Sequence, residues 1–139
     1  MCLKLNNNYI RIYFNAITEK DQEMGYSTVL LDEAIEKKKK AQEALRLQLL
    51  EKLSHALHAL SREIPFEEAF LFGSITEPFR FSERSDIDVG FVGLHDDHFF
   101  RAMSFLSAEL CVDVDIVQLE AHRLGEKIKR EGTRWKKKE

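Results

Sequence analysis

The sequence is poor in cysteine and has no long apolar run. Its two cysteines, Cys2 and Cys111, are too few for a disulfide framework, and their spacing fits no zinc motif, so a reducing cytoplasm is the expected compartment. No apolar stretch approaches the roughly 20 residues that span a bilayer. The apolar residues near the N-terminus are interrupted at positions 6–8 and 11, which argues against a signal peptide. We therefore expect a cytoplasmic protein with no membrane contact.

Charge of one sign is also lacking. The formal net charge of −3 gives no general signal for nucleic-acid binding. Basic residues gather only in a run at positions 37–40 and in a tail at 127–138. The run is typical of a solvated helix face, although a contact with nucleic acid or an acidic partner is a less favoured alternative. With 44% hydrophobic and 32% charged residues in a chain of 139, the composition indicates one folded domain.

Six glycines and two prolines leave long segments without a break. Residues 1–27 show no clear period and are interpreted as an N-terminal arm or short hairpin, with disorder as the alternative and Met24 as a second candidate start. Over residues 28–63, apolar residues recur at steps of three and four, which predicts one long helix that ends before Pro65. This helix is longer than a small core needs, so we expect it to project from the domain or to break near positions 37–40.

Shorter elements form the expected core at 64–135, before a basic tail at 136–139. Asp96 or Asp97 is expected to serve as the cap or as a first-turn acid of a helix there, and Gly132 to end the last helix. Strands that alternate with helices indicate an α/β or α+β fold, in which helices pack a small mixed β-sheet. The apolar pattern predicts strands at 69–72, 87–92 and 112–117, a polar loop at 76–85, and helices at 95–110 and 120–130.

Gly73 and Ser74 follow the first predicted strand. Glycine lets the backbone turn sharply and lets a ligand approach without a Cβ in the way. Serine offers a hydroxyl and a backbone N–H to a phosphate oxygen, and a helical turn starting there would add a favourable dipole. By itself, Gly-Ser after a strand is usually only a turn.

Two pairs of aspartates alternate with β-branched residues. Asp86 and Asp88 begin the second predicted strand, and Asp113 and Asp115 begin the third. Residues two apart on a strand point to the same face, so the carboxylates of each pair would lie side by side. Such carboxylates repel one another and are costly to bury without a cation, and oxygen ligands of this kind suit Mg²⁺. The alternative is a solvated strand start. Three strand ends that converge at one sheet edge would make a two-metal phosphoryl-transfer site.

The run LFGSITEPFRFSERSDIDVGFVG followed by VDVDIVQLE resembles the minimal nucleotidyltransferase family of the polymerase-beta-like nucleotidyltransferase superfamily. That family has a Gly-Ser turn, a spacer of about ten residues, Asp-x-Asp, and a third aspartate on a later strand. The resemblance covers about residues 45–135, including IKREGTRW, which is similar to the family's C-terminal helix. It implies a palm-like nucleotidyltransferase fold, with Mg²⁺ as cofactor, two ions being expected, and ATP as substrate.

The resemblance also assigns site residues by position. Asp115 matches the third aspartate and would act as metal ligand and general base, while Asp113, on the same strand face, is the alternative. The residues assigned to the site are Gly73, Ser74 and Ser85 for binding the nucleotide, and Asp86, Asp88 and Asp115 for metal binding and catalysis.

The sequence departs from the family pattern directly after Gly-Ser. The spacer from Ser74 to Asp86 is eleven residues long, and positions 75–78 read ITEP where the family often has a basic residue and a glycine. Loss of a basic contact and the gain of Glu77 should weaken phosphate binding. Arg80 or Arg84 could compensate, or both could be solvated loop charges.

Other candidate sites in the sequence are weaker. His55 and His58 are three apart on the long helix, but the nearest partners for a shared metal are missing. The run HDDH at 95–98 has ligand chemistry but falls at a helix start, where acidic residues are expected anyway. The phenylalanines fit a core better than a platform for stacking bases.

These observations lead to a functional hypothesis. About twenty residues follow the third strand, too few for the acceptor-binding domain of larger enzymes in the superfamily, so we expect a second protein to complete the site or to be the acceptor. The resemblance implies an antitoxin that transfers AMP from ATP to a hydroxyl of a HEPN-domain toxin. One alternative is a degenerate binding module that neutralises its partner by contact. Another is transfer to RNA or to a small hydroxyl compound such as an antibiotic. Formation of a homo-oligomer stays open.

Overall fold

The computed structural model describes residues 28–137. The expected N-terminal arm, with Met24 and Cys2, and the last two residues of the basic tail lie outside this range. None of the helices in the described range is both long and apolar enough to cross a membrane. The elements in chain order are α2 (Thr28–Glu63), β1 (Glu68–Phe72), the 3₁₀ turn η1 (Gly73–Thr76), β2 (Ile87–Val92), the 3₁₀ turn η2 (Asp96–His98), α3 (Phe99–Leu110), β3 (Val114–Gln118), α4 (Gly125–Glu131) and β4 (Thr133–Trp135).

The strands form a mixed sheet of order β3-β2-β1-β4. β1 runs antiparallel to both of its neighbours, whereas β2 and β3 are parallel and are connected through α3. A parallel pair needs such a crossover because a short turn cannot bring the chain back to the same end of the sheet. The structure thus confirms the predicted α+β architecture, a small mixed sheet packed by helices.

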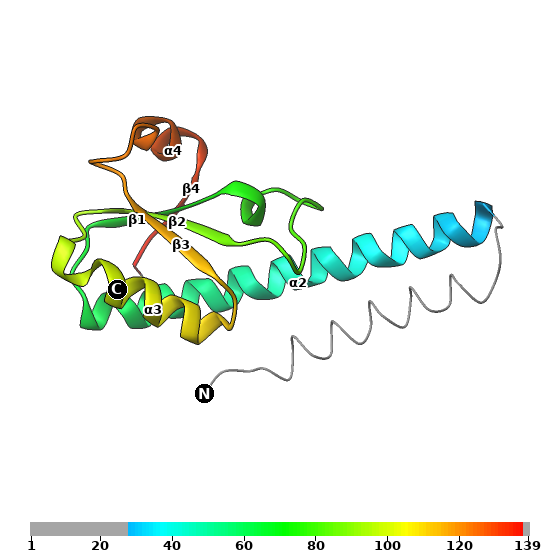
Figure 1. The fold of residues 1–139 in the computed structure, drawn as a ribbon, viewed down its shortest axis with the longest axis horizontal. Coiled ribbons are helices and arrows are strands. Elements are labelled where there is room, and N and C mark those ends of the chain that lie inside the picture. Colours follow the sequence, from blue (N-terminus) through cyan, green and yellow to red (C-terminus); the bar gives the residue numbers. More distant parts are fainter. Residues whose placement is uncertain (1–27, 138–139) are drawn as a thin grey trace.

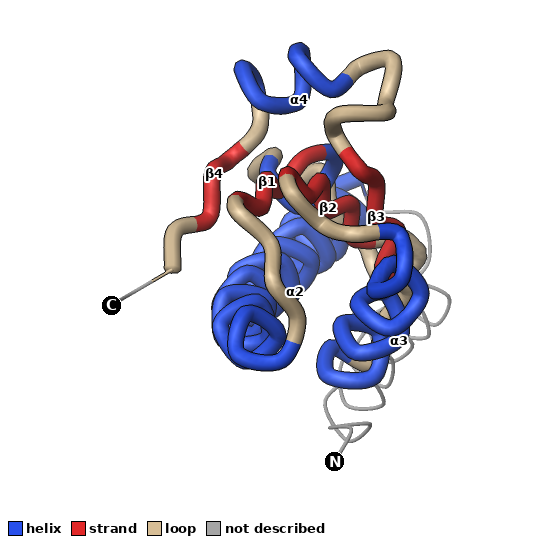
Figure 2. Tube along the Cα trace, turned by 90° about the vertical axis from the view of Figure 1, so that its left-hand side faces the viewer, coloured by secondary structure: helices blue, strands red, loops and turns tan. Residues whose placement is uncertain are grey.

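One face of the sheet carries the main core. α2 and α3 lie side by side against this face, and α4 lies on the opposite side (Figure 2). The alternation of the strands explains the division, because Ile87, Val89 and Phe91 of β2 all point into the main core and are fully buried. Leu53 and Leu57 of α2 meet them from the helix side with no exposed surface, and burying each of these side chains contributes about 2 kcal/mol.

The N-terminal half of α2 extends past the sheet (Figure 1). The first buried residue of the helix is Leu45, and positions 35–40 upstream of it are all exposed. Of the two expected outcomes for this helix, projection is therefore correct, because the helix continues through positions 37–40 without a break. The apolar stripe that packs on the sheet fills only its second half.

The second face of the sheet is covered only in part. Ile128 of α4 packs in a smaller cluster with Phe70 and Leu119. Gly90 is needed beneath it, since a Cβ there would lie 2.6 Å from a Leu119 methyl carbon. Phe72, the residue directly before Gly73, is half-buried and packs against this cluster.

The C-terminal part of the prediction is wrong in two respects. The predicted helix 120–130 begins only at Gly125, because residues 118–125 form successive turns in which Ala121 N–H bonds to Gln118 O and Gly125 N–H to His122 O. The segment similar to a closing helix instead ends as β4, whose Thr133–Trp135 pair with β1. At Gly132 the backbone is already extended, so the chain leaves α4 directly into this strand.

Two smaller expectations are refined by the structure. The helical turn near position 95 is capped by His95, whose Nδ1 accepts the Asp97 N–H at 3.2 Å. Asp96 and Asp97 take the other expected role, as acidic residues of the first turn. The predicted strand 112–117 begins at Val114 and extends to Gln118.

Candidate functional site

The strand register brings two of the predicted carboxylates together. Asp88 of β2 and Asp115 of β3 are partners in the parallel pairing, so they occupy adjacent strands on the same face, about 4.8 Å apart in the pairing direction. Asp86 lies two residues before Asp88 and therefore near the same face. This is the face opposite α2 and α3, because Ile87 and Val89 point into the main core. A shared Mg²⁺ site, as expected from the sequence, requires these three aspartates to lie on one face of the sheet.

Asp113 occupies a different place. Its carbonyl oxygen accepts the Ile87 N–H at 3.0 Å, which puts it beside the start of β2, one step before the Asp88–Asp115 pair. Asp113 and Asp115 are both exposed, but only Asp115 is opposite Asp88. The register thus favours Asp115 over Asp113 as the partner of Asp88.

Asp88 has an unusual electrostatic environment. Partial burial raises the pKa of its carboxyl group, and the negative charges of Asp115 and then Asp86 raise it further. The order of these causes shows that desolvation is the largest effect and that both neighbouring carboxylates lie within electrostatic reach. A cation placed among the three would relieve this repulsion.

The donor chemistry of the three aspartates fits Mg²⁺, which prefers carboxylate oxygens supplemented by phosphate and water. Across residues 28–137, however, no group of three His, Cys, Asp or Glu side chains is arranged as a ready-made metal site. The three aspartates can influence one another electrostatically without forming a ready-made metal site, because carboxylates that no cation neutralises repel one another and stay apart. Asp86, Asp88 and Asp115 are therefore the residues that would hold the ion, and the aspartate side chains would have to converge on it.

Gly73 touches this cluster from the side of β1. Its φ of +77° lies in the left-handed region, and a Cβ at this position would lie 2.5 Å from Asp88 Oδ2. Glycine is therefore required twice, once for backbone conformation and once for space. Ser74 follows as the second residue of η1, a turn that is closed by a 2.7 Å hydrogen bond from Thr76 Oγ1 to the Gly73 carbonyl. The predicted Gly-Ser turn and the carboxylate cluster thus lie in contact.

A buried ion pair from α2 holds the other side of this turn. Arg46 is 7% exposed and is the one buried charged residue in the described part of the chain. Its Nη1 donates a 3.0 Å hydrogen bond to Ile75 O, and its Nη2 binds Glu43 at 2.6 Å. Glu43 Oε2 accepts the Phe79 N–H at 2.8 Å. The pair therefore fixes both the turn and the loop that follows it.

Glu43 and Arg46 strengthen each other's charge. The hydrogen bond from Arg46 and then the one from Phe79 N–H lower the pKa of the Glu43 carboxyl, and the same contact raises the pKa of Arg46. Phe79 has a φ of +62°, a conformation that is strained for a bulky residue and is held here by its bond to Glu43. No local sequence pattern indicates this role for Arg46, because its partner Ile75 is 29 residues away.

The predicted loop residues are engaged locally. The Ser85 hydroxyl oxygen accepts the Ser82 N–H at 3.0 Å and lies 3.2 Å from the Ser82 hydroxyl, so it closes the turn before Asp86. Arg80 is exposed and pairs with Glu77 at 3.7 Å. Arg84 is exposed as well. These positions give no sign that Arg80 or Arg84 replaces the missing basic contact.

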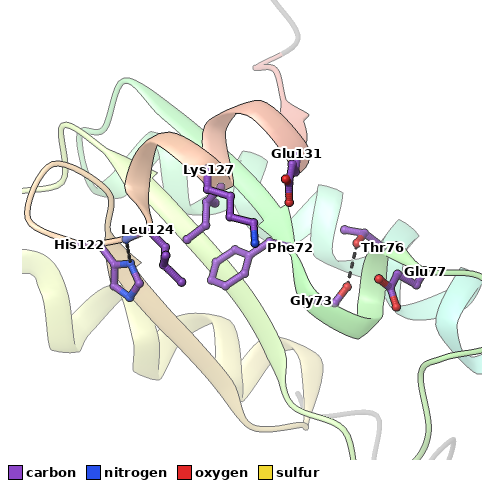
Figure 3. A pocket seen from close by; sticks show the side chains of 10 residues that line it. Phe72, Gly73, Thr76, Glu77, His122, Leu124, Lys127 and Glu131 are labelled. Carbon is purple, nitrogen blue, oxygen red and sulfur yellow. Dashed lines mark hydrogen bonds between the residues drawn. The ribbon is translucent and has the colours of Figure 1, made fainter.

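A cavity of about 300 Å³ adjoins the Gly73 turn. It lies between β1, η1 and α4, and Figure 3 shows the Lys127 side chain extending from α4 toward Phe72 and the turn. The sequence pattern predicts no role in the site for the residues of α4. The lining residues are Phe72, Gly73, Thr76, Glu77, His122, Leu124, Lys127, Ile128, Glu131 and Gly132.

Comparisons with known proteins add one distant likeness. No protein-family model and no curated protein matches the sequence. Among solved structures, the chain is similar to one in the crystal structure of the toxin-antitoxin MntA-HepT, with a TM-score of 0.46 and 22% identity, over 62% of this chain and 71% of that chain. A functional assignment therefore depends on the residues of the site.

Proposed function

We propose that this protein is a Mg²⁺-dependent nucleotidyltransferase that transfers AMP from ATP to a hydroxyl group of a partner protein. One observation carries the proposal. Asp88 is flanked by Asp115 on the neighbouring strand and by the glycine of the Gly-Ser turn, which approaches its carboxylate closely enough to exclude any side chain. This proximity of a carboxylate suited to Mg²⁺ and a turn suited to phosphate supports the proposal, because transfer of a phosphoryl-linked group requires both.

The proposed roles follow from this placement. The backbone N–H groups and hydroxyl of the Gly73-Ser74 turn bind phosphate oxygens. Asp86, Asp88 and Asp115 would hold Mg²⁺, which would supply charge neutralisation at the phosphate and help to orient the attacking oxygen. Asp115 accepts the proton of the acceptor hydroxyl. The new bond joins the acceptor oxygen to the α-phosphorus, the bond from that phosphorus to the bridging oxygen breaks, and pyrophosphate leaves.

The raised pKa of Asp88 supports the metal requirement. Burial and two neighbouring negative charges disfavour its carboxylate form, so the ionised cluster destabilises the fold when no cation is bound. Since the cluster does not stabilise the fold, binding of a cation is the better explanation for its presence.

A macromolecular acceptor fits the exposure of the site. Asp86 and Asp115 are both exposed, so a group on a second protein can reach them. We therefore propose that the partner is a HEPN-type toxin and that the chain acts as its antitoxin, as the resemblance in the sequence implies.

Binding without catalysis is the second candidate. The projecting part of α2 exposes three apolar side chains, Val29, Leu31 and Ile35, at 64%, 52% and 43%. Leu31 and Ile35 are four residues apart and share one face of the helix, a spacing typical of a helix that docks into a groove of a partner. Neutralisation by contact would use this part of the helix and would not need the aspartates.

One assay separates these functions. The chain is incubated with Mg²⁺, ATP labelled at the α-phosphate, and the protein encoded by the adjacent gene, with RNA and an aminoglycoside in parallel reactions. We expect label on the partner with wild type and with Asp113→Asn, and none with Asp86→Asn/Asp88→Asn. Neutralisation that survives the double substitution, without label transfer, would establish binding alone. Label on RNA or on the antibiotic would replace the protein acceptor.

A further inference from the structure

The cavity beside the Gly73 turn adjoins the candidate site. We propose that it binds the nucleoside part of the nucleotide, and that Lys127 supplies the phosphate contact missing after Gly73-Ser74. This inference rests on the proposed function, since it assumes that phosphates bind at the turn. The inference assigns a role to α4, a helix that contributes none of the aspartates and no part of the Gly-Ser turn.

The position of the cavity follows from the strand register. Phe72 is the register partner of Asp88, and the next residue, Gly73, approaches Asp88 Oδ2. Both Phe72 and Gly73 line the cavity. A nucleotide whose phosphates lie between the turn and Asp88 therefore has the cavity at its nucleoside end.

The lining has the chemistry of a nucleoside site. Phe72 offers an aromatic ring for stacking a base, and Leu124 and Ile128 add apolar surface. Glu77 and Glu131 also line the cavity, and their carboxylates accept hydrogen bonds but cannot donate them when ionised. They suit ribose hydroxyls or an exocyclic amine, whereas they would repel a phosphate placed inside the cavity. This division favours the nucleoside within the cavity and the phosphates at its rim.

Lys127 is the only lysine or arginine that lines the cavity. Within residues 28–137 its ammonium group forms no ion pair or hydrogen bond, whereas Lys129, on the same short helix, pairs with Glu126 at 3.5 Å. Figure 3 shows the Lys127 side chain lying over Phe72 toward the turn. An unpaired ammonium on a flexible stem is well suited to bind phosphate as a point charge.

The walls of the cavity are fixed by packing. Ile128 is 7% exposed in the smaller core cluster. A Cβ on Gly132 would lie 2.9 Å from the Leu71 carbonyl oxygen, so the end of α4 lies directly on β1. The cavity is therefore largely formed before a ligand binds, as is usual for nucleotide sites.

Calorimetric titration with two probes tests the proposal. Mg²⁺-ATP contains both halves of the ligand, and Mg²⁺-tripolyphosphate lacks the nucleoside. Lys127→Met should lower the affinity for both probes by about 10-fold, because it removes a charge that contacts phosphate. Lys129→Met makes the same change on the same helix but outside the cavity. It should leave the affinity for each probe within about twofold of wild type.

The cavity itself is tested by filling it. Leu124→Trp should lower the affinity for Mg²⁺-ATP by about 10-fold or more and leave the affinity for Mg²⁺-tripolyphosphate unchanged, since the new side chain fills only the space of the nucleoside. Leu47→Trp changes another exposed leucine that does not line the cavity, and it should alter neither probe. Thermal unfolding of each variant identifies loss of the fold. As a second readout, photocrosslinking of wild type with 8-azido-ATP should label peptides within 72–77 or 122–132.

The outcomes separate the two proposals. If wild type binds Mg²⁺-ATP and loses it on Asp88→Asn, while Lys127→Met and Leu124→Trp match their controls, the cavity assignment is overturned and the proposed function stands. Equal affinity of wild type for ATP and tripolyphosphate, or crosslinks confined to other peptides, would also overturn it. If wild type binds neither probe in Mg²⁺, the proposed function fails, and this inference fails with it.

Discussion

Arg46 Nη1 lies 3.0 Å from the carbonyl oxygen of Ile75, so a buried cation of α2 is bonded directly to the turn that contacts Asp88. The same guanidinium is held by Glu43, which in turn holds the backbone of Phe79. Through these contacts the long helix sets the shape of the Gly-Ser turn, in addition to covering the sheet.

Replacing Arg46 with methionine should therefore affect both stability and ligand binding. The substitution leaves Glu43 without its cation and the Ile75 carbonyl without a donor, which should lower the free energy of unfolding by about 2–4 kcal/mol. It should also weaken ATP binding, because the turn loses its support. Urea unfolding and titration with Mg²⁺-ATP measure the two effects.

The Arg101–Glu63 pair provides the control. Its partners are 3.7 Å apart and exposed, so Arg101→Met should change the free energy of unfolding by no more than about 0.5 kcal/mol. Equal effects of the two substitutions would show that Arg46 has no special role at the turn.

Gly73→Ala tests the close approach of the turn to Asp88. Alanine is strained at a φ of +77°, and its Cβ would lie 2.5 Å from Asp88 Oδ2. We expect a loss of about 1–3 kcal/mol in the free energy of unfolding, together with loss of Mg²⁺-ATP binding. A stable variant that binds the nucleotide normally would contradict the placement of the phosphates at this turn.

Asp88→Asn should stabilise the metal-free protein at neutral pH. The folded-state pKa of Asp88 is raised, first by burial and then by Asp115 and Asp86, so its ionised form disfavours the fold. The destabilisation is absent below the unfolded pKa of about 3.9, develops as the pH rises toward the folded pKa, and is complete above it.

Thermal unfolding in EDTA at several pH values measures this effect. The midpoint of Asp88→Asn should exceed that of wild type at pH 7, and the difference should shrink near pH 3. A lower midpoint at pH 7 would show that the Asp88 carboxylate stabilises the metal-free fold, contrary to the direction of its pKa shift.

The sequence predicted the elements that depend on local pattern. The strand at Ile87–Val92 and the helix that ends at Glu63 follow from apolar periodicity, and the structure has them at those positions. Spacing alone left Asp113 and Asp115 on the same strand face, and the choice of Asp115, which the register pairs with Asp88, came from the resemblance to nucleotidyltransferases. Residue spacing was sufficient for the strand and the helix but not for this choice.

Features that depend on distant contacts could not be predicted in this way. The start of α4 is set by the backbone of Leu119, since a Cβ on Gly125 would lie 2.0 Å from its carbonyl oxygen. The final segment becomes a strand because β1 has a free edge for Thr133–Trp135. Arg46 and Lys127 have no local signature, since one acts across 29 residues and the other lies over a cavity formed by three elements.

Asp115 and Asp113 should differ in the transfer reaction. Asp115 is opposite Asp88 and would remove the proton from the acceptor, so Asp115→Asn should lower the rate by about 10² to 10⁴-fold. Asp113 precedes β3 and lies beside Ile87 rather than Asp88, so Asp113→Asn should keep at least about a third of the rate. Initial rates with α-labelled ATP measure the contrast, and a larger loss with Asp113→Asn would reverse the assignment.

The most direct test is calorimetric titration of ATP into the protein in Mg²⁺ and in EDTA, for wild type, Asp88→Asn and Asp113→Asn. We predict that ATP binds wild type and Asp113→Asn only when Mg²⁺ is present, and that Asp88→Asn weakens this binding by at least about 100-fold, as expected for loss of a metal ligand. Equal binding in EDTA, or unchanged binding by Asp88→Asn, would contradict a metal-dependent nucleotide site at Asp88.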